Sequence, residues 1–313
     1  MASLYEAIKA CRACGHSSLE PVLDLGMQGL PGFPLPDEPP PPKAPLELVL
    51  CQHCSLLQLA HTVDREVLFR NYWYRSGTSE TMRAALKDVA DEAMGRVELK
   101  FADIVLDIGS NDGTLLNFFR ANVQVRTVGF DPCGTPSLPW NHSEWYECDF
   151  FSAARYKNFY PEKASIITAL AMFYDLDDPR KFLADVRDCL ADDGLFIIQQ
   201  NDRDIMVRDL TYDNIGFEHL CYYDVPQMRG LARAAGLRCF EATYNEVNGG
   251  SHRLFFKRDQ PELVGSSYIT FGLSDFATRV KAESTRLGYF IADLVEAGKT
   301  VYALGASTRG LTI

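Results

Sequence analysis

The spacing of apolar residues along the middle of the chain is that of strands alternating with helices. Short apolar runs that end at glycine or acidic residues predict buried strands, and apolar residues that recur every three or four positions predict helices. The predicted strands cover 104–106, 125–130, 165–170 and 195–198, followed by a pair at 237–244 and 252–257. The predicted helices cover 79–95, 114–121, 178–190 and 226–235. This alternation predicts an α/β fold with a doubly wound, mostly parallel sheet that carries a strand pair at its end.

The two ends of the chain depart from this pattern. Residues 31–45 are too rich in proline for a helix or a central strand, so we expect a stiff loop there, followed by a short strand over 46–50. Beyond residue 260 the apolar positions predict one long amphipathic helix over 276–294. Residues 300–310 then look like a strand leading into a glycine turn, which is how a further α/β domain would open. We therefore predict three segments, namely a cysteine module over 1–78, a central domain over 79–260, and the start of an incomplete C-terminal domain over 261–313.

The composition narrows the classes of function. Of the 313 residues, 47% are hydrophobic and 23% are charged, which is usual for a globular protein. No apolar run reaches the ~18–20 residues of a membrane helix, and the N-terminal sequence lacks the features of a secretory signal. We therefore expect a cytoplasmic protein with no membrane partner. A formal net charge of −11 argues against nucleic-acid binding and leaves the oligomeric state open.

Two CxxC pairs near the N-terminus are the most specific chemical signal. Cys11 and Cys14 are followed, after 36 intervening residues, by Cys51 and Cys54. Four thiolates at this spacing can close a tetrahedral site that leaves no open position, so we predict a structural metal and expect Zn²⁺. Three nearby histidines leave open the alternative that one of them replaces a cysteine: His16, His53 and His61. The other cysteines are expected to be small buried residues: Cys133, Cys148, Cys189, Cys221 and Cys239.

A glycine-rich turn follows the first predicted strand of the central domain. Its pattern, Asp107-x-Gly109-x-x-x-Gly113, differs from the G-x-G-x-x-G dinucleotide fingerprint and matches the D/E-x-G-x-x-x-G pattern of class I S-adenosylmethionine methyltransferases. The glycines let the backbone approach a ligand, and the helix that follows offers N–H donors to the methionine carboxylate. Asp131, which ends the next strand, is placed to accept the ribose hydroxyls, and Asp149 is placed near the adenine amine. The turn pattern alone is also typical of any tight strand-to-helix connection.

A Glu-His pair and an aromatic segment complete the candidate chemical groups. His219 is the natural general base, because the reference pKa of histidine lies near neutrality, and Glu218 can orient it or raise its basicity. We expect the segment 217–223 that contains the pair on the rim above the cofactor; the alternative is a surface pair beside core tyrosines. The segment Tyr72–Ser79 could lay a tyrosine over the cofactor or could pack between domains, and Ser79 is also a plausible helix N-cap.

Together these motifs resemble those of the zinc-containing sugar C-methyltransferases of deoxysugar and antibiotic biosynthesis. The resemblance rests on the two cysteine pairs and on the segments 68–79, 107–114, 218–223, 248–251 and 305–310. It implies a class I methyltransferase Rossmann-like sheet, an N-terminal four-cysteine zinc module and a truncated C-terminal α/β segment.

The resemblance also implies a reaction and its residues. In such enzymes a His-Glu pair removes the acidic proton next to a 4-keto group of a nucleotide-linked sugar, and the enolate attacks the sulfonium methyl of S-adenosylmethionine. This implies that His219 is the base, that Glu218 is its partner and that Tyr74 is a further catalytic-site residue. The residues expected to bind the cofactor are Asp107, Gly109, Asn111, Asp112, Gly113, Asp131, Asp149, Tyr72 and Ser79. The alternatives are an O- or N-methyltransferase of a small natural-product scaffold and a non-catalytic zinc-ribbon interaction protein.

The chain differs from the family pattern close to the predicted base. Gly216 and Phe217 stand where family members often carry a tyrosine and a histidine, and 173–175 stands where some sugar enzymes place a histidine. The roles of Tyr174 and Asp175, the identity of the sugar and its nucleotide, and the position that is methylated are therefore left open.

Overall fold

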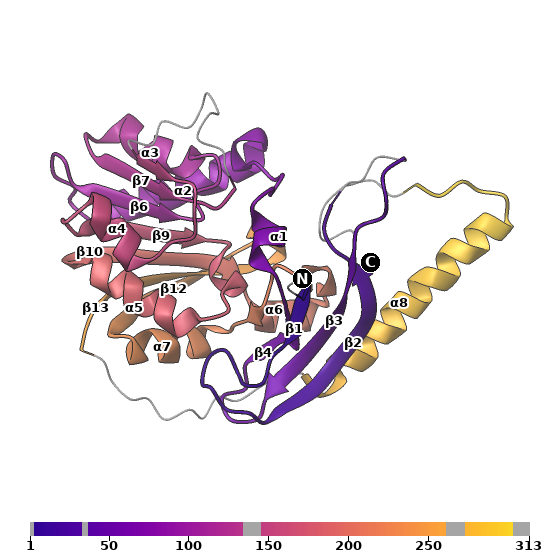
Figure 1. Cartoon of the computed structure of the whole chain (residues 1–313). Helices are drawn as coiled ribbons and strands as arrows, with labels where there is room; N and C mark the ends of the chain where they lie inside the picture. The colour runs from indigo at the N-terminus through magenta and orange to yellow at the C-terminus, as the bar shows by residue number, and fades with distance from the viewer. Residues whose placement is uncertain (1–2, 33–36, 134–144, 261–272, 303–313) are drawn as a thin grey trace. The chain divides into compact units, whose positions relative to one another are not determined.

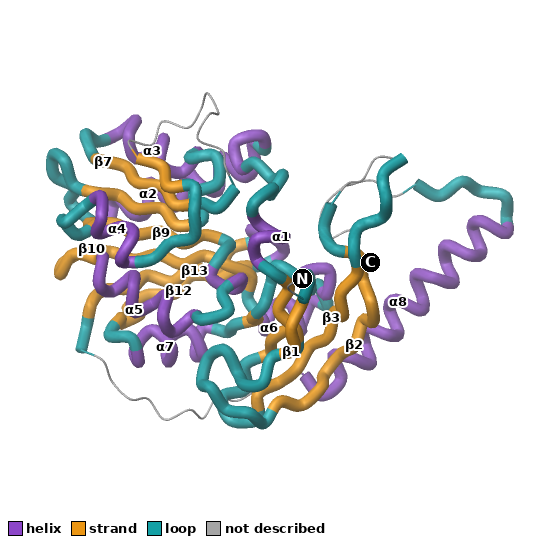
Figure 2. The backbone as a smooth tube through the Cα atoms, viewed as in Figure 1, coloured by secondary structure: helices purple, strands orange, loops and turns teal. Residues whose placement is uncertain are grey.

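The computed structural model describes residues 3–32, 37–133, 145–260 and 273–302, which form two compact units. Unit 1 comprises Met1–Asp64, Asp202–Tyr222 and Ser267–Ile313. Unit 2 comprises Arg65–Asn201 and Tyr223–Ser266. Figures 1 and 2 show the helices and strands of each unit. The predicted segments 1–78, 79–260 and 261–313 follow the order of the chain and stay a prediction, whereas the units group residues by their contacts in space.

Unit 2 is built on a seven-stranded sheet whose strands run in the order β12-β13-β10-β9-β6-β7-β8. These strands are β6 (Ile104–Ile108), β7 (Arg126–Phe130), β8 (Trp145–Glu147), β9 (Ala164–Leu170), β10 (Leu190–Asn201), β12 (Leu237–Asn245) and β13 (Ser251–Arg258). The strands from β10 to β8 pair in parallel, and β13 pairs antiparallel with both β10 and β12. The predicted α/β fold, a mostly parallel sheet with a strand pair at its end, is confirmed.

Helices flank these strands, and four of them begin at a residue whose side chain caps the helix. The helices are α1 (Arg65–Phe69), α2 (Glu80–Arg96), α3 (Thr114–Asn122), α4 (Ala153–Phe159), α5 (Pro179–Cys189) and α7 (Val225–Ala234), with short 3₁₀ turns η1 (Ser76–Thr78), η2 (Phe173–Asp175) and η4 (Val247–Gly249). The four with such a cap are α2, α4, α5 and α7. The Ser79 side chain accepts a hydrogen bond from the Met82 amide, 3.3 Å away, and so caps α2 as predicted. Asp224 and Gln227 form a reciprocal capping box at the start of α7.

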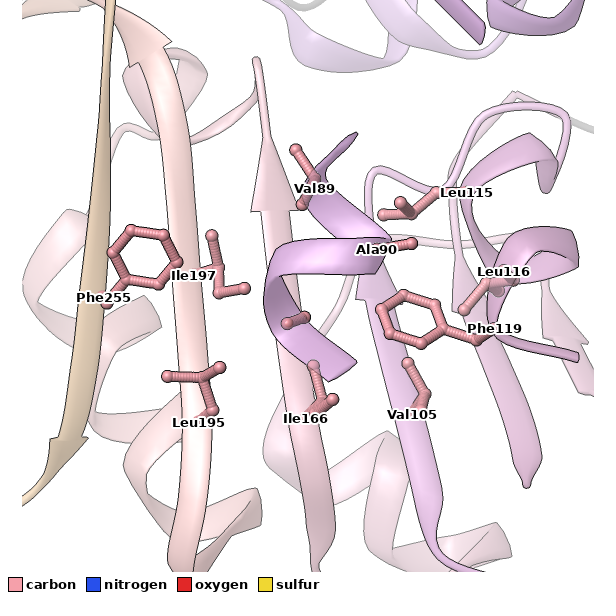
Figure 3. Close-up of a cluster of buried hydrophobic side chains, with 11 residues drawn as sticks. Val89, Ala90, Val105, Leu115, Leu116, Phe119, Ile166, Leu195, Ile197 and Phe255 are labelled. Carbon is pink, nitrogen blue, oxygen red and sulfur yellow. The ribbon is translucent and has the colours of Figure 1, made fainter. Parts of the chain in front are cut away.

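Side chains of α2 and α3 pack on one face of this sheet (Figure 3). Val89 of α2 and Phe119 of α3 are fully buried, and so are Val105 of β6 and Ile166 of β9 beneath them. Apolar residues of this size each contribute roughly 1.5–3 kcal/mol when they leave water. The turn between β6 and α3 therefore starts and ends on well-packed elements.

An ion-pair cluster fixes α2 to the antiparallel part of the sheet. Arg253 of β13 is buried, with its guanidinium 2.8 Å from a carboxylate oxygen of Asp88 and bonded also to Glu92. Its Nε donates to the side-chain oxygen of Gln199 on β10, at 2.7 Å. Arg253 is the buried member of this cluster, so loss of both carboxylates would leave an uncompensated buried charge and would be strongly destabilising.

Unit 1 holds a four-stranded antiparallel sheet in the order β11-β4-β3-β2 and a two-stranded sheet of β1 and β5. The strands are β1 (Tyr5–Ala7), β2 (Leu19–Gly29), β3 (Lys43–Cys51), β4 (Leu57–Leu59), β5 (His61–Val63) and β11 (Cys221–Tyr222). β3 is longer than the predicted strand over 46–50 because it pairs with β2 back to Lys43 and includes Pro45. Residues 33–36 of the proline-rich loop lie outside the described residues.

Residues 202–222, which we call the insertion, belong to unit 1 although they lie between two segments of unit 2 along the chain. The insertion contains α6 (Arg203–Asp209), η3 (Tyr212–Asn214) and β11, which pairs antiparallel with β4. The Leu59 amide donates to the Leu220 carbonyl at 2.9 Å, and the buried Arg203 guanidinium donates to the Ser55 carbonyl at 3.2 Å. The edge of β4 needs backbone partners, and this segment supplies them from a distant part of the chain.

The predicted long helix is α8 (Leu273–Glu296). Its first turns bury Phe276 and Val280, and Arg279 donates to the carbonyls of Val207 and Arg208, each at 2.9 Å. Of the strand predicted after it, residues 300–302 are not in a strand, and the glycine turn 305–310 lies outside the described residues. None of the helices in the described ranges has both the length and the apolar character needed to cross a membrane.

Candidate functional site

The glycine turn lies at the carboxyl end of β6, between the two neighbours β9 and β7. The chain leaves β6 toward β7 and later returns to β9 on the other side, so this is the point where a doubly wound sheet binds ligands. Gly109, Asn111 and Gly113 all have positive φ, at 74°, 51° and 77°. A Cβ at Gly109 would lie 3.0 Å from Cγ of Met172, so the turn has no room for a larger residue.

Two aspartates flank this turn and differ in chemistry. Asp107 is buried and accepts a hydrogen bond from the Thr168 hydroxyl at 2.6 Å. Burial raises the pKa of Asp107 to about 7, against the lowering effect of Thr168. Asp131 accepts the amide of Asn111 at 2.8 Å on one oxygen and the amide of Cys133 at 2.9 Å on the other. Each carboxylate oxygen has two acceptor sites, so Asp131 is held in place with capacity for two hydroxyl donors.

The segment before α2 is clamped onto the turn, and we call residues 72–78 the strap. The Asn111 side chain accepts the Ser76 amide and donates to the Tyr74 carbonyl, both at 2.9 Å. The Gly77 amide donates to an Asp112 carboxylate oxygen at 2.7 Å. The structure therefore brings the predicted residues of the strap and of the turn together.

Asp112 is the centre of this clamp. It is fully buried, and its second oxygen accepts the Thr114 hydroxyl at 2.7 Å and the Thr114 amide at 3.2 Å. Burial, followed by the charge of Asp112, raises the pKa of Tyr74. Tyr72 packs its ring near those of Phe69 and Trp73. The cofactor roles predicted for Tyr72, Asp112 and Ser79 stay predictions. In the structure, each of these side chains makes contacts that support the fold.

Asp149, which follows β8, lies between two arginines that the sequence reasoning did not include. One oxygen accepts from Arg70 at 2.9 Å and from the Phe150 amide at 2.8 Å, and the other is 2.5 Å from Arg155. Burial by itself would raise the pKa of Asp149, but these donors outweigh it, so the pKa is lowered. Its predicted contact with an adenine amine stays a prediction. The expectation that Cys148 is buried was wrong, because its side chain at the end of β8 is exposed.

In unit 1 the four predicted metal ligands form one cluster. The sulfur atoms of Cys11, Cys14, Cys51 and Cys54 all lie within 4.8 Å of one another. Two of the sulfur–sulfur distances are 3.5 and 3.6 Å, close to the ~3.8 Å edge of a tetrahedron with metal–sulfur bonds of about 2.3 Å. The donor set therefore fits a tetrahedral thiolate site with no open position.

The two halves of this cluster have the same backbone geometry. Gly15 and Ser55, which follow the second cysteine of each pair, both have positive φ and donate to the carbonyl of the pair's first cysteine. His16 and His53 are exposed, and their rings stack 5.1 Å apart. The complete set of four sulfurs favours cysteine as the only ligand type among the described residues.

The candidate base also lies in unit 1. Nδ1 of His219 is 2.7 Å from the carbonyl oxygen of Asn214 in η3. A carbonyl can only accept, so Nδ1 carries the proton in the neutral ring and Nε2 carries the basic lone pair. Sequence reasoning missed Asn214, because a backbone acceptor leaves no signal in residue type.

The carboxyl group of Glu218 is buried and only partly hydrogen-bonded. Its Oε1 has no hydrogen-bond partner among the residues that the structure describes. Burial raises the pKa of Glu218 to about 7. A Cβ at Gly216 would lie 3.3 Å from Glu218 Oε2, so the absent side chain at Gly216 leaves space for this carboxyl group. A buried carboxyl group that has a raised pKa and one oxygen without a partner among the described residues is a candidate functional group.

Comparison with known proteins defines the class. Residues 74–242 match the model of the family described as "Methyltransferase domain", and residues 11–69 match that described as "Putative zinc binding domain". The first match spans more than half of the chain, so the chain belongs to the methyltransferase domain family and is an S-adenosylmethionine-dependent methyltransferase.

One relative matches nearly the whole of this chain. The chain is 27% identical to "C-methyltransferase NovU" of Streptomyces niveus over 342 aligned positions, which cover 99% of this chain and 78% of that protein. The predicted family resemblance is thereby confirmed. Among solved structures, the mitomycin 7-O-methyltransferase MmcR is 15% identical with a TM-score of 0.46, covering 58% of this chain and 55% of that one. An S-adenosylmethionine-dependent methyltransferase from Clostridium acetobutylicum is 13% identical with a TM-score of 0.45, covering 57% and 92%.

Proposed function

We propose that the protein methylates a carbon atom next to a keto group of a nucleotide-linked deoxysugar, with His219 as the general base. The observation that carries this proposal is the hydrogen bond from His219 Nδ1 to the Asn214 carbonyl, which leaves Nε2 as the basic nitrogen. Carbon methylation is also the activity named for the relative NovU. The sugar class rests on the motif resemblance.

In this reaction, Nε2 of His219 removes the proton next to the ketone, and the enolate carbon forms the new bond to the methyl group. S-adenosylmethionine supplies that methyl group as an electrophile bonded to a sulfonium. The turn 109–113 would hold its methionine part at the N-terminus of α3, and Asp131 would hold the ribose hydroxyls. Neutral Glu218 can donate a proton or a hydrogen bond to the developing oxyanion, since its pKa is raised to about 7.

We also propose that the metal of the four-cysteine cluster is zinc. Four thiolates in tetrahedral arrangement suit Zn²⁺, and they leave no position for a substrate or a water molecule. The metal then supports the fold of unit 1 and takes no part in the chemistry.

A proton-exchange experiment tests the role of His219 as the base separately from the binding of the methyl donor. In D₂O without S-adenosylmethionine, the protein should exchange the proton next to the ketone of a nucleotide-linked keto-sugar, as followed by NMR. His219→Gln should abolish this exchange and leave the affinity for S-adenosylhomocysteine, measured by calorimetry, unchanged. Asp131→Asn should do the reverse, with affinity at least about tenfold weaker and exchange retained. A product that carries the new methyl on oxygen or nitrogen would disprove the carbon assignment.

A further inference from the structure

The C-terminal end of α6, within the insertion, is held by a side chain from α8. The last four carbonyls of a helix have no partner inside it and need donors from elsewhere. In α6 the Met206 carbonyl accepts the amide of Thr211 at 3.1 Å. The carbonyls of Val207 and Arg208 accept from the two terminal nitrogens of Arg279, each at 2.9 Å. Arg279 therefore supplies two of the donors that this helix end requires.

Arg279 lies next to the anchored part of α8. Phe276 and Val280 are 0% and 1% exposed, and α8 contacts β2 of the same unit. Residues three or four positions apart on a helix are neighbours on its surface, so Arg279 lies beside this buried stripe. A cation at a helix C-terminus also faces the negative end of the helix dipole. The end of α6 is thus fixed to a helix that is itself held by apolar packing.

The turn that follows α6 depends on such support. Leu210 has φ 57° and ψ 36°, in the left-handed region, which costs a residue with a Cβ about 1–2 kcal/mol. A conformation of this kind persists only where the contacts around it determine it. The bonds from Arg279 hold the carbonyls two and three positions before Leu210. Without them, the strain at Leu210 favours a different path of the chain.

A short series of hydrogen bonds leads from this turn to the candidate base. Thr211 directly follows Leu210 and accepts the Asn214 amide on its carbonyl at 3.1 Å. The Thr211 hydroxyl accepts the side-chain amide of Asn214 at 3.2 Å. The Asn214 carbonyl is the group that lies 2.7 Å from Nδ1 of His219. The position of Thr211 therefore sets the position of the carbonyl that selects the tautomer of His219.

We infer that Arg279 is a positioning residue for His219, because it fixes the end of α6 and with it the turn that presents the Asn214 carbonyl to Nδ1. When Arg279 is removed, the carbonyl shifts and the proton of the neutral ring is free to move to Nε2. A ring with its proton on Nε2 has no lone pair there and cannot act as the base through that nitrogen. The catalytic consequence rests on the proposed function, whereas the effect on the tautomer does not.

The test compares three variants of the full chain. Arg279→Met removes both donors and keeps a long apolar side chain. Arg279→Lys keeps the charge at the helix end but lacks the planar fork that reaches two carbonyls at once. Lys281→Met is the matched control, because Lys281 is an exposed residue of the same helix and its loss removes the same charge.

NMR of protein labelled with ¹⁵N in its histidines reads the tautomer of His219 at a pH where the ring is neutral. The signals of His219 are those missing from His219→Gln. Wild type and Lys281→Met should hold the proton on Nδ1, Arg279→Met should shift it largely to Nε2, and Arg279→Lys should lie between. The signals of His61, in β5 of the same unit, report whether unit 1 is folded. If Arg279→Met does not fold, Arg279→Lys carries the comparison.

Proton exchange in D₂O, with a nucleotide-linked keto-sugar, then measures the catalytic consequence. The exchange rate should be about tenfold lower in Arg279→Met and within about twofold of wild type in Lys281→Met. Affinity for S-adenosylhomocysteine, a property of unit 2, should be unchanged in both.

Two results would overturn the inference. One is a His219 spectrum in Arg279→Met that is the same as in wild type, and in Arg279→Lys if Arg279→Met does not fold. The other is an equal change of tautomer in Arg279→Met and Lys281→Met, which would reduce the effect to a loss of charge. A shifted tautomer with an unchanged exchange rate would disprove His219 as the base and would leave its positioning by Arg279 supported.

Discussion

Replacing Gly77 by alanine tests whether the strap controls the methyl-donor site. A Cβ at this position would lie 2.6 Å from the Thr114 hydroxyl oxygen and 3.0 Å from an Asp112 carboxylate oxygen. Neither atom can move freely, because the hydroxyl and the carboxylate are bonded to each other and Asp112 is fully buried. The added methyl group must therefore strain the clamp or displace the strap.

Straining the clamp and displacing the strap cost different amounts of free energy, and the smaller of the two costs determines the size of the effect. Overpacking of this kind costs about 1–3 kcal/mol. Displacement breaks the charge-assisted bond from Gly77 to Asp112, worth roughly 1.5–3 kcal/mol, and the two neutral bonds of Asn111, worth roughly 0.5–1.5 kcal/mol each. Strain is thus the cheaper route. The strain is relieved in part by a shift of the turn at Asn111 and Asp112. We expect this shift to weaken the contacts of the turn with S-adenosylhomocysteine by about 2 kcal/mol, which corresponds to about 30-fold weaker binding.

Isothermal calorimetry with S-adenosylhomocysteine measures this change without any substrate. The matched control is Gly95→Ala, because Gly95 is an exposed position of α2 with no atom within 4 Å of its added Cβ. That change should leave the affinity as it is and stabilise the helix by about 0.5–1 kcal/mol. If Gly77→Ala binds S-adenosylhomocysteine as tightly as Gly95→Ala does, the strap has no role in the cofactor site.

Two further variants test unit 1. The pKa of Glu218 is raised from 4.5 to about 7, so the unfolded chain releases this proton first and the free energy of unfolding falls as pH rises between these values. Glu218→Gln cannot titrate and so lacks this pH dependence. Between pH 4 and pH 8 its free energy of unfolding, measured by urea unfolding followed by circular dichroism, should rise by about 3 kcal/mol relative to that of the wild type. A difference independent of pH would contradict the raised pKa. Cys51→Ser should release the metal and increase hydrogen exchange over 203–222, with affinity for S-adenosylhomocysteine retained. Full protection of 203–222 in that variant would show that the insertion folds without the metal.

Local sequence was sufficient wherever a short segment contains all of its own determinants. The alternation of apolar runs predicted the longer strands and helices of unit 2, since each of these elements buries a face whose period can be counted. The short elements α1, β8 and α4 were not predicted. The turn 109–113 was predicted because its glycines and its position after a buried strand are properties of one short stretch. The cysteine pairs were predicted for a similar reason, because a CxxC pair places two sulfurs side by side through local backbone geometry alone.

Contacts between distant segments were decided only by the tertiary structure. The acceptor for His219 is a backbone carbonyl, and the arginines at Asp149 come from other elements, so neither has a pattern in the sequence. The pairing of β4 with β11 joins residues more than 150 positions apart and assigns 202–222 to the metal-binding unit. Burial of Asp107 and Glu218 likewise depends on what packs around them, and it is burial that raises both pKa values. The sequence by itself thus determined which chemical groups the protein has, and the tertiary structure decided their partners and their protonation, because both depend on neighbours that folding brings from far along the chain.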